Sequence, residues 1–471
     1  MKKLAAIAAA AVLLCGCTDK QSGADTPKPS ETSPAVSESG KTIVNIAALG
    51  PVTISELSDP LNMPQDIDVK ITDYGKGADD LTAAFRNLKS DVLYGECPDI
   101  VILDPDNIVR LENAGGLADL GELMDGYDGI KREDFLPNVI DGFTLNGRIP
   151  GLSEAFTIKT AMAKTKFVPA EYENWTPAQA TEFYNDLPDG MEFMELWSTD
   201  ELAQYMLWRV QFDCVDTSAW TCDFTAGSFI DTLRFCSEQQ LYAFEPDFES
   251  MTDSERAEFS LHEELKGVSD EYLVFPVDIS DFGSGLAQMT YGFLGMEDFT
   301  FVGYPSDSGN GTITYTEGSN IHHGMYGIPQ RSGAKEQAWE LLSFIIGQQP
   351  KLEKNAMIST GIPVLMEQLD RDYRRSVDYS NSINRSFSLP GALGSENYSP
   401  DDPDMNGTLS QEQKDRLHDY ILSVKFEPYA SLEIRALASM ETAAVLAGDM
   451  SAEQCAVVLN DRIGTYLSEK E

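Results

Sequence analysis

The segment Pro98–Asn107 constrains the fold of this chain more than any other. Ile100–Leu103 is a short, unbroken apolar run, the pattern of a strand buried on both faces of a parallel sheet. The polar stretch Asp104–Asn107 reads as a loop, and the apolar spacing after it predicts a helix. Strand, loop and helix make half of a βαβ unit, and the carboxyl end of such a strand faces the ligand crevice of an open α/β sheet. We therefore predict that Asp104–Asn107 line a binding cleft.

The sequence around this segment continues the α/β pattern. Apolar runs predict strands at Thr42–Leu49 and Ile67–Tyr74, and a helical period predicts a helix at Asp80–Tyr94. Residues 42–120 thus have the order β, β, α, β, α of a doubly wound unit.

The middle of the chain is predicted to mix helices and strands, and the part after residue 347 is predicted to be helical. An Asn-Gly hairpin is expected at Gly142–Arg148, before a Pro-Gly segment where the chain crosses between domains. Strands are expected at Tyr272–Val277 and Gln288–Tyr304, and His323–Pro329 reads as a strand that returns to the first unit. The predicted helices cover residues 176–187, 200–212, 226–240, 334–347, 411–424, 432–447 and 451–468.

Charge excludes several classes of partner. The chain has 471 residues and a net charge of −43. Such a chain lacks the basic surface of nucleic-acid-binding proteins, so we expect no nucleic acid. Attraction to anionic lipid headgroups is disfavoured for the same reason, and membrane attachment needs another cause.

The N-terminus supplies that cause. Two lysines precede the apolar run Leu4–Leu14, which is too short to span a bilayer and has the length of a signal-peptide core. Leu14–Cys17 resembles a bacterial lipobox, which predicts a lipoprotein signal peptide at residues 1–17 and a lipid on Cys17; ordinary secretory cleavage with a free Cys17 is the alternative. Residues 18–41 are polar and rich in Ser, Thr and Pro, so we expect a flexible tether.

One local pattern suggests a hydrolase. Gly151–Ala155 is one residue short of the G-x-S-x-G nucleophile elbow, and His322, His323 and His418 follow it in the order of a hydrolase triad. A secreted serine hydrolase that uses Ser153 is therefore an alternative from another class. The last Gly is missing, and the sequence after Ser153 looks extended where the elbow needs a helix.

Metal ligands are not expected, although one segment keeps the question open. The adjacent His322 and His323 would point to opposite faces of a strand. Asp402–Leu409 matches part of a calcium loop, but Gln413 stands where the bidentate Glu belongs. Ser410–Gln413 is also a capping box that begins a helix. We predict no metal and no cofactor, with calcium at 402–413 as the alternative.

Cysteines after the signal peptide are odd in number and match no zinc motif: Cys97, Cys214, Cys222, Cys236 and Cys455. One bridge among Cys214, Cys222 and Cys236 is an option, and buried free thiols are the other.

Two tryptophans are candidates for a sugar site. Trp197 and Trp220 stand beside loop-like sequence, and sugar sites stack aromatic faces on the ring while carboxylates and amides bind its hydroxyls. Core packing is the alternative for each of them. Trp339 lies on the apolar face of its predicted helix and is assigned to the core.

Five segments in the same order resemble the extracellular solute-binding lipoproteins of ABC importers, the sugar-binding group that includes maltose-binding protein. The first is the lipobox with its tether. The others are Pro98–Val101 with Gly115–Leu120, Asp298–Pro305 with Gly309–Gly311, Tyr326–Pro329 with Lys335–Phe344, and Ala452–Ala456 with Arg462–Glu469. The likeness covers almost all of residues 42–471.

This resemblance implies an α/β, type II periplasmic-binding-protein-like fold, in which two lobes are joined by a hinge around an interlobe cleft. Lobe one would comprise 42–148 plus 318–350, and lobe two 149–317 plus 351–471. The implied function is to capture a carbohydrate, expected to be an oligosaccharide, and deliver it to ABC transporter permease subunits; a binding-protein-derived sensor is the runner-up. The chain would be a non-enzymatic monomer, lipid-anchored on the extracellular face of the bacterial cytoplasmic membrane.

The resemblance also implies site residues. By position, Glu154 and Asp106 match sugar-binding carboxylates, and Tyr291 and Phe293 lie where the family supplies a stacking aromatic. The chain departs from the family pattern at Leu103, where an aromatic is common, and at Leu57–Pro64. The predicted ligand-binding set is Asp104, Asp106, Asn107, Glu154, Trp197, Trp220, Tyr291 and Phe293.

Overall fold

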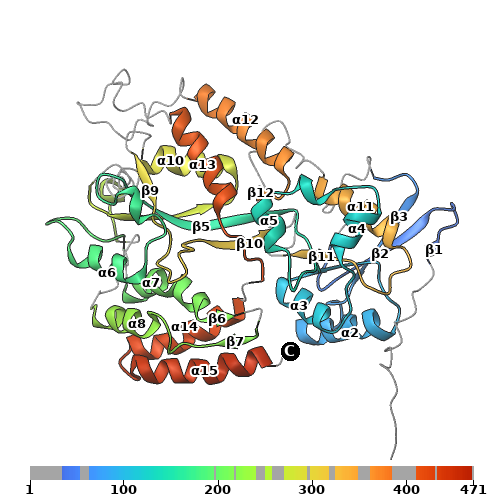
Figure 1. Cartoon of the computed structure of the whole chain (residues 1–471), viewed down its shortest axis with the longest axis horizontal. Coiled ribbons are helices and arrows are strands. Elements are labelled where there is room, and N and C mark those ends of the chain that lie inside the picture. Colours follow the sequence, from blue (N-terminus) through green and yellow to red (C-terminus); the bar gives the residue numbers. More distant parts are fainter. Residues whose placement is uncertain are drawn as a thin grey trace, which may run out of the picture. The chain divides into compact units, whose positions relative to one another are not determined.

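Two β-sheets, each flanked by helices, organise the chain in the computed structural model (Figure 1). The structure describes residues 34–52, 63–195, 198–216, 219–239, 250–256, 270–293, 298–317, 324–347, 361–383, 410–429 and 432–468. Among these residues, no helix combines the length and the apolar character needed to cross a membrane.

The first sheet forms around β2 (Thr42–Ala48). This strand runs parallel to β3 (Ile67–Asp73) and β4 (Ile100–Leu103), while β11 (Met325–Gly327) pairs antiparallel with β4. All four residues of β4 are buried, which confirms the prediction from their unbroken apolar run. The helical segments of residues 81–142 and 335–347 are α2 (Leu81–Tyr94), α3 (Pro105–Asn113), α4 (Leu120–Gly126), η1 (Arg132–Asp134), α5 (Pro137–Gly142) and α11 (Lys335–Gly347).

The predicted tether, residues 18–41, ends in ordered structure. Ala35 and Val36 form β1, which pairs antiparallel with the start of β2. A short turn follows, in which the Ser37 amide donates to the Lys41 carbonyl at 2.9 Å. The prediction of a tether up to residue 41 is therefore wrong at its end, because these few residues gain backbone hydrogen bonds from the edge of β2.

The second sheet forms around β5 (Ala155–Lys164), and every partner of β5 is antiparallel to it. The partners are β8 (Val274–Ile279), β9 (Phe299–Phe301), β10 (Ile313–Glu317) and β12 (Ile362–Pro363). A separate hairpin pairs β6 (Val215–Asp216) with β7 (Thr221–Cys222). The helices are η2 (Ala170–Tyr172), α6 (Pro177–Asn185), α7 (Thr199–Asp213), α8 (Phe229–Glu238), α10 (Phe282–Phe293), α12 (Met366–Ile383), α13 (Gln411–Ser423), α14 (Leu432–Leu446) and α15 (Ala452–Ser468).

Successive side chains of β5 point to opposite faces of the sheet, and they pack into two different hydrophobic cores. Phe156, Ile158 and Met162 belong to one apolar cluster, whereas Ala161 and Ala163 belong to the other. Figure 1 shows α10, α12 and α13 over one face of this sheet and α7, α8, α14 and α15 over the opposite face.

In the order of the described strands, the chain passes between the two sheets three times: from β4 to β5, from β10 to β11, and from β11 to β12. The first passage is the predicted Pro-Gly crossing, where Leu152 pairs with Tyr326 through two backbone hydrogen bonds of 2.7 and 3.0 Å. Just before it, Asn146 and Gly147 have φ of 51° and 79°, and Leu145 and Arg148 bond to each other across the turn. This is the predicted Asn-Gly turn.

One predicted strand is wrong over most of its length. Residues 288–293 belong to α10, and among the described residues of the segment Gln288–Tyr304 only Phe299–Phe301 form a strand. The Asp281 carboxylate accepts the Ser284 amide at 2.9 Å, which is a helix start. Phe282, Leu286 and Met289 are buried at helical spacing, so packing outweighs the β propensity of the aromatic residues here.

Candidate functional site

The predicted loop after β4 is the first turn of α3. Asp104 is the N-cap, and its carboxylate accepts the Asn107 amide at 2.9 Å and the Asn107 side-chain amide at 2.6 Å. Pro105 occupies the first helical position, where its missing N–H costs nothing. The structure thus brings Asp104 and Asn107 together, and the cap explains why these residue types stand here.

Asp106 connects α3 with the last helix of the chain. It lies in the first turn of α3, and its carboxylate accepts the Tyr466 hydroxyl of α15 at 3.2 Å. The same hydroxyl lies 3.4 Å from the Glu433 carboxylate of α14. A phenol has one proton to donate, so Tyr466 serves one of the two carboxylates at a time. Asp106 is therefore next to the start of α14.

Glu154 lies at the crossing that leads into β5. Its carboxylate accepts a short hydrogen bond from the Tyr326 hydroxyl of β11, which belongs to the other sheet. Ser153 beside it is fully buried, and its hydroxyl donates to the Ala155 carbonyl at 3.0 Å. β5 begins at Ala155, two residues after Ser153, so the strand–turn–helix geometry of a nucleophile elbow is missing.

The predicted aromatic residues that the structure describes lie in the β6–β7 hairpin and in α10. Trp220 is half-buried in the β6–β7 hairpin, has a φ of 53°, and packs against the core beneath α7 and α8. Tyr291 and Phe293 lie in α10, and the structure does not describe their side chains. Trp197 lies outside the described residues, as do His322 and His323.

A pocket that the sequence did not indicate lies between α7 and α14. Its volume is about 210 Å³. Its lining residues are Asp200, Ala203, Gln204, Trp208 and Gln211 on α7, and Arg435, Ser439, Thr442, Ala443 and Leu446 on α14. The α7 residues recur every three or four positions and so share one helix face, which was the only signal for them in the sequence.

Trp208 and Arg435 form one end of this pocket. The Arg435 guanidinium stacks over the Trp208 ring at 3.6 Å and donates to the Tyr315 hydroxyl at 3.4 Å. On the other side, the Tyr304 ring lies 5.1 Å from the Trp208 ring, centroid to centroid. The Trp208 indole N–H is buried without an acceptor. Burial raises the pKa of Tyr315 even though Arg435 opposes this, so the Tyr315 phenol stays neutral.

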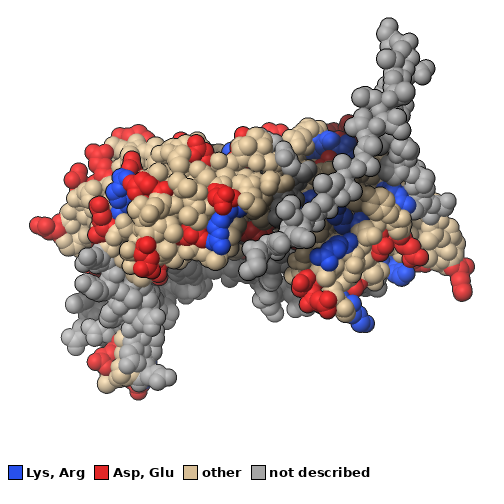
Figure 2. Space-filling view, turned by 90° about the horizontal axis from the view of Figure 1, so that it is seen from below, with Lys and Arg blue, Asp and Glu red and all other residues tan. Residues whose placement is uncertain are grey.

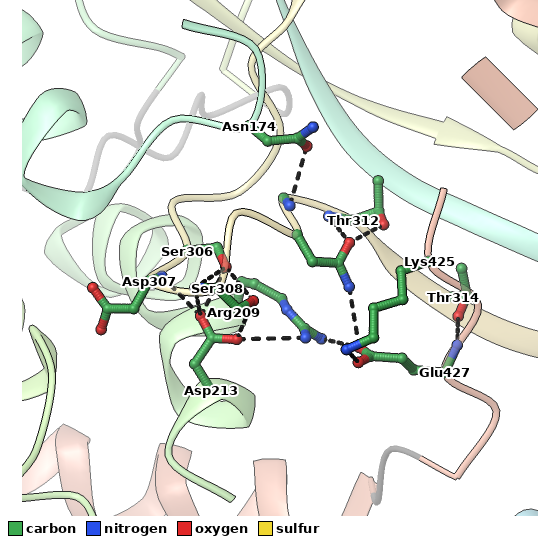
Figure 3. Close-up of polar contacts among 12 residues, drawn as sticks. Asn174, Arg209, Asp213, Ser306, Asp307, Ser308, Thr312, Thr314, Lys425 and Glu427 are labelled. Atoms are coloured by element: carbon green, nitrogen blue, oxygen red, sulfur yellow. Dashed lines mark hydrogen bonds and ion pairs between the residues drawn. The ribbon is translucent and has the colours of Figure 1, made fainter. Parts of the chain in front are cut away.

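A buried ion-pair network supports the opposite face of α7 (Figure 3). Arg209, which is 4% exposed, lies 3.4 Å from the Asp213 carboxylate and 2.5 Å from that of Glu427. Asp213 accepts the hydroxyls of Ser306 and Ser308, both at 2.8 Å. The network therefore ties α7 to the 306–308 loop and to the segment that precedes α14.

The same loop explains the Gly-Tyr-Pro … Gly-Asn-Gly pattern. Gly303 has a φ of +67°, and a Cβ atom there would lie 2.5 Å from the Gly311 carbonyl oxygen. Asn310 donates its side-chain amide to Glu427 at 3.2 Å, and the Gly311 amide donates to the Asn174 side chain at 3.1 Å. The glycines let the two segments of this loop, at Gly303 and at Gly311, pack closely against each other. This packing places the Asn310 side chain where it can bond to Glu427 of the ion-pair network.

Surface charge and cysteine chemistry agree with the expectations from composition. On the face shown in Figure 2, acidic side chains are spread widely between fewer basic ones. The described cysteines are all free, and burial raises the pKa of Cys214 and Cys236 to about 12, so both stay protonated thiols.

Among the described residues no group of three or more His, Cys, Asp or Glu could hold a metal. The expected capping box at Ser410 is confirmed, whereas residues 402–409 lie outside the described part.

Solved structures show a similar fold. No protein-family model and no curated protein matches the chain. The sugar-binding protein MalE from Xanthomonas citri is 15% identical, with a TM-score of 0.52 over 91% of this chain and 98% of that one. A periplasmic oligogalacturonide-binding protein from Yersinia enterocolitica is 13% identical, with a TM-score of 0.50 over 91% of this chain and 99% of that one. The chain therefore has the two-lobed α/β fold of periplasmic binding proteins, which confirms the predicted fold class.

Proposed function

We propose that the protein is an extracellular carbohydrate-binding protein that delivers its ligand to an ABC importer. The observation that carries this proposal is the α7–α14 pocket, in which an aromatic ring, a guanidinium, amides and hydroxyls converge within a two-lobed binding fold. At about 210 Å³ the pocket has room for several water molecules, at roughly 10–15 Å³ each, and so for a group as large as a sugar ring. The two proteins of similar fold are named for binding a sugar and an oligogalacturonide.

Ligand capture would use both lobes. On the first lobe, Asp104, Asp106 and Asn107 at the start of α3 are proposed to bind sugar hydroxyls, with Glu154 at the crossing. Carboxylates and amides can each satisfy more than one hydroxyl, which is why sugar sites use them. The aromatic residues proposed to stack on sugar rings are Trp197, Trp220, Tyr291 and Phe293.

Closure of the lobes would be stabilised by the contact between Asp106 and Tyr466. Asp106 belongs to the helix after β4, and Tyr466 belongs to the last helix, which packs against the other sheet's core. A ligand bound in the pocket lies beside α14, and the first turn of α14 carries Glu433, the second acceptor for Tyr466. Ligand binding can shift the lobe equilibrium only through such differential contacts.

Attachment to the membrane would rest on the N-terminus. We propose cleavage after residue 16, a lipid on Cys17, and a tether that ends before β1 at Ala35. The lobes, 42–148 plus 318–350 and 149–317 plus 351–471, would act as a monomer that presents both lobes to the permease on the extracellular face of the cytoplasmic membrane.

A ligand screen tests the proposal. We would measure thermal unfolding of the purified protein against a panel of mono- and oligosaccharides, neutral and acidic. A ligand at a hundredfold excess over its Kd stabilises the folded state by about 2.7 kcal/mol. If no sugar shifts the melting temperature, and ester hydrolysis is found that disappears in Ser153→Ala, the protein is a hydrolase and the proposal is wrong.

A further inference from the structure

Among the residues that the structure describes, Arg435 has no carboxylate partner. The chain has 77 acidic residues, yet in the described part of the molecule no carboxylate lies within ion-pair distance of this guanidinium. Its described contacts are the Trp208 ring at 3.6 Å and the Tyr315 hydroxyl at 3.4 Å. Both contacts hold the guanidinium in place, and neither of these two partners carries a negative charge.

The neighbouring charges do not neutralise it. Lys159 lies 5.9 Å from the Trp208 ring and is paired with Asp278 at 2.8 Å, so this pair adds no net charge. Asp200 also lines the pocket, but it precedes Trp208 by two helical turns on α7, roughly 12 Å along the axis. The pocket therefore has an acidic end and a cationic end.

The cationic end also has spare hydrogen-bonding capacity. Gln211 lines the pocket, is 5% exposed, and makes no side-chain hydrogen bond with another described residue. An amide that lines a pocket and has no bond to these residues can donate to a ligand and accept from it. Gln211 and Arg435 lie on facing helices and both line the pocket.

We propose that this pocket selects a carboxylated sugar, a uronate, whose carboxylate binds the guanidinium of Arg435. The inference rests on the proposed function and specifies its substrate class. A planar guanidinium fixed on an aromatic ring offers two parallel N–H groups, which match the two oxygens of a carboxylate. Gln211 would donate to a ring hydroxyl or to the same carboxylate, and the hydroxyls of Ser439 and Thr442 would bond the remaining sugar oxygens.

Isothermal titration calorimetry with matched sugars tests the inference. Each uronate is paired with the neutral sugar that differs only at the carboxylate: glucuronic acid with glucose, galacturonic acid with galactose, and the corresponding trimers. We expect the uronate of the recognised pair to bind at least tenfold more tightly. Arg435→Gln should abolish this preference by lowering the affinity for the uronate at least tenfold more than the affinity for the neutral sugar, and Arg435→Lys should restore only part of it, because a lysine lacks the planar fork.

Control variants separate charge at this position from charge elsewhere. Arg256→Gln removes an exposed arginine paired with Asp253 at 3.4 Å, outside the pocket, and should leave the preference intact. Melting of each variant without ligand checks that the fold is retained. If neutral sugars bind as tightly as uronates, or the preference survives Arg435→Gln, the inference is wrong while the carbohydrate-binding function stands. If no sugar binds, the proposed function itself fails.

Discussion

Removing Arg209 should reveal how much the second lobe depends on its buried ion-pair network. The Arg209 and Asp213 side chains are 5% and 7% exposed, and Glu427 is 25% exposed. Removing one member of a buried pair costs about 3–5 kcal/mol, because it leaves the other charge uncompensated. Asp213 would keep its serine hydroxyls, and Glu427 would keep Asn310. We therefore expect Arg209→Met to lower the free energy of unfolding by about 3 kcal/mol, the lower end of the range.

Lys425 provides a matched control, because it binds the same carboxylate. Its ammonium lies 2.6 Å from Glu427, but its side chain is 64% exposed. An ion pair with such an exposed partner is worth about 0–1 kcal/mol, so Lys425→Met should be nearly silent. Both variants would be compared with the wild type by urea unfolding followed by circular dichroism, using midpoint shifts at an unchanged slope.

The pH dependence of the effect gives a second test. Burial acts to raise the pKa of Glu427, but Arg209 and Lys425 together bring it below its usual value. In the wild type, Glu427 thus contributes stability above its unfolded pKa of about 4.3 and loses it as the pH falls through the lower folded pKa. Without Arg209, burial should dominate and raise the folded pKa, so the variant's deficit should be larger at pH 7 than at pH 4. A deficit below about 1 kcal/mol, or one that does not change with pH, would refute the reasoning.

Two further predictions concern the lobe contact and the Gly303 turn. Tyr466→Phe removes a hydrogen bond worth about 1 kcal/mol, so it should weaken ligand binding about fivefold without changing the melting temperature of the free protein. Asp106→Ala should weaken ligand binding more. If neither variant changes the affinity for the ligand, the contact between Asp106 and Tyr466 does not belong to the binding site. Gly303→Ala should lower the free energy of unfolding by more than about 2 kcal/mol, since the new Cβ meets the Gly311 carbonyl. Gly309→Ala should cost only about 1 kcal/mol, because Gly309 has a φ of +73° but no atom lies within 4 Å of the added Cβ. Equal losses of unfolding free energy in urea would contradict this prediction.

Local patterns in the sequence predicted the parts of the fold that local physics decides. The apolar run of β4 and the N-cap of α3 depend on neighbouring residues alone, so the strand and the helix after it were predictable. α10 was missed because its helical form depends on packing against residues distant in the sequence, which outweighs β propensity.

The sequence pointed to the candidate site only at the residues that come directly after the predicted strand β4. Asp104 and Asn107 were chosen as ligands, yet the same residue types cap helices, and the structure uses them as a cap. The contact between Trp208 and Arg435 joins two helices far apart in the chain, and neither residue belongs to a motif. A single sequence carries no signal for such a pair, because the contact exists only in the folded structure.

Two arginines on either side of the same pocket wall are held in opposite ways. Arg209 is buried and paired with two carboxylates, and it directs one face of α7 toward the 306–308 loop. Trp208, the residue before it, lies about 100° around the helix and turns its ring to the pocket, where Arg435 stacks on it. The chain has 77 acidic residues, and none of those in the described part of the structure forms an ion pair with Arg435. The network that fixes Arg209 thereby also fixes the ring on which the unpaired guanidinium rests, and it keeps that charge available for a ligand.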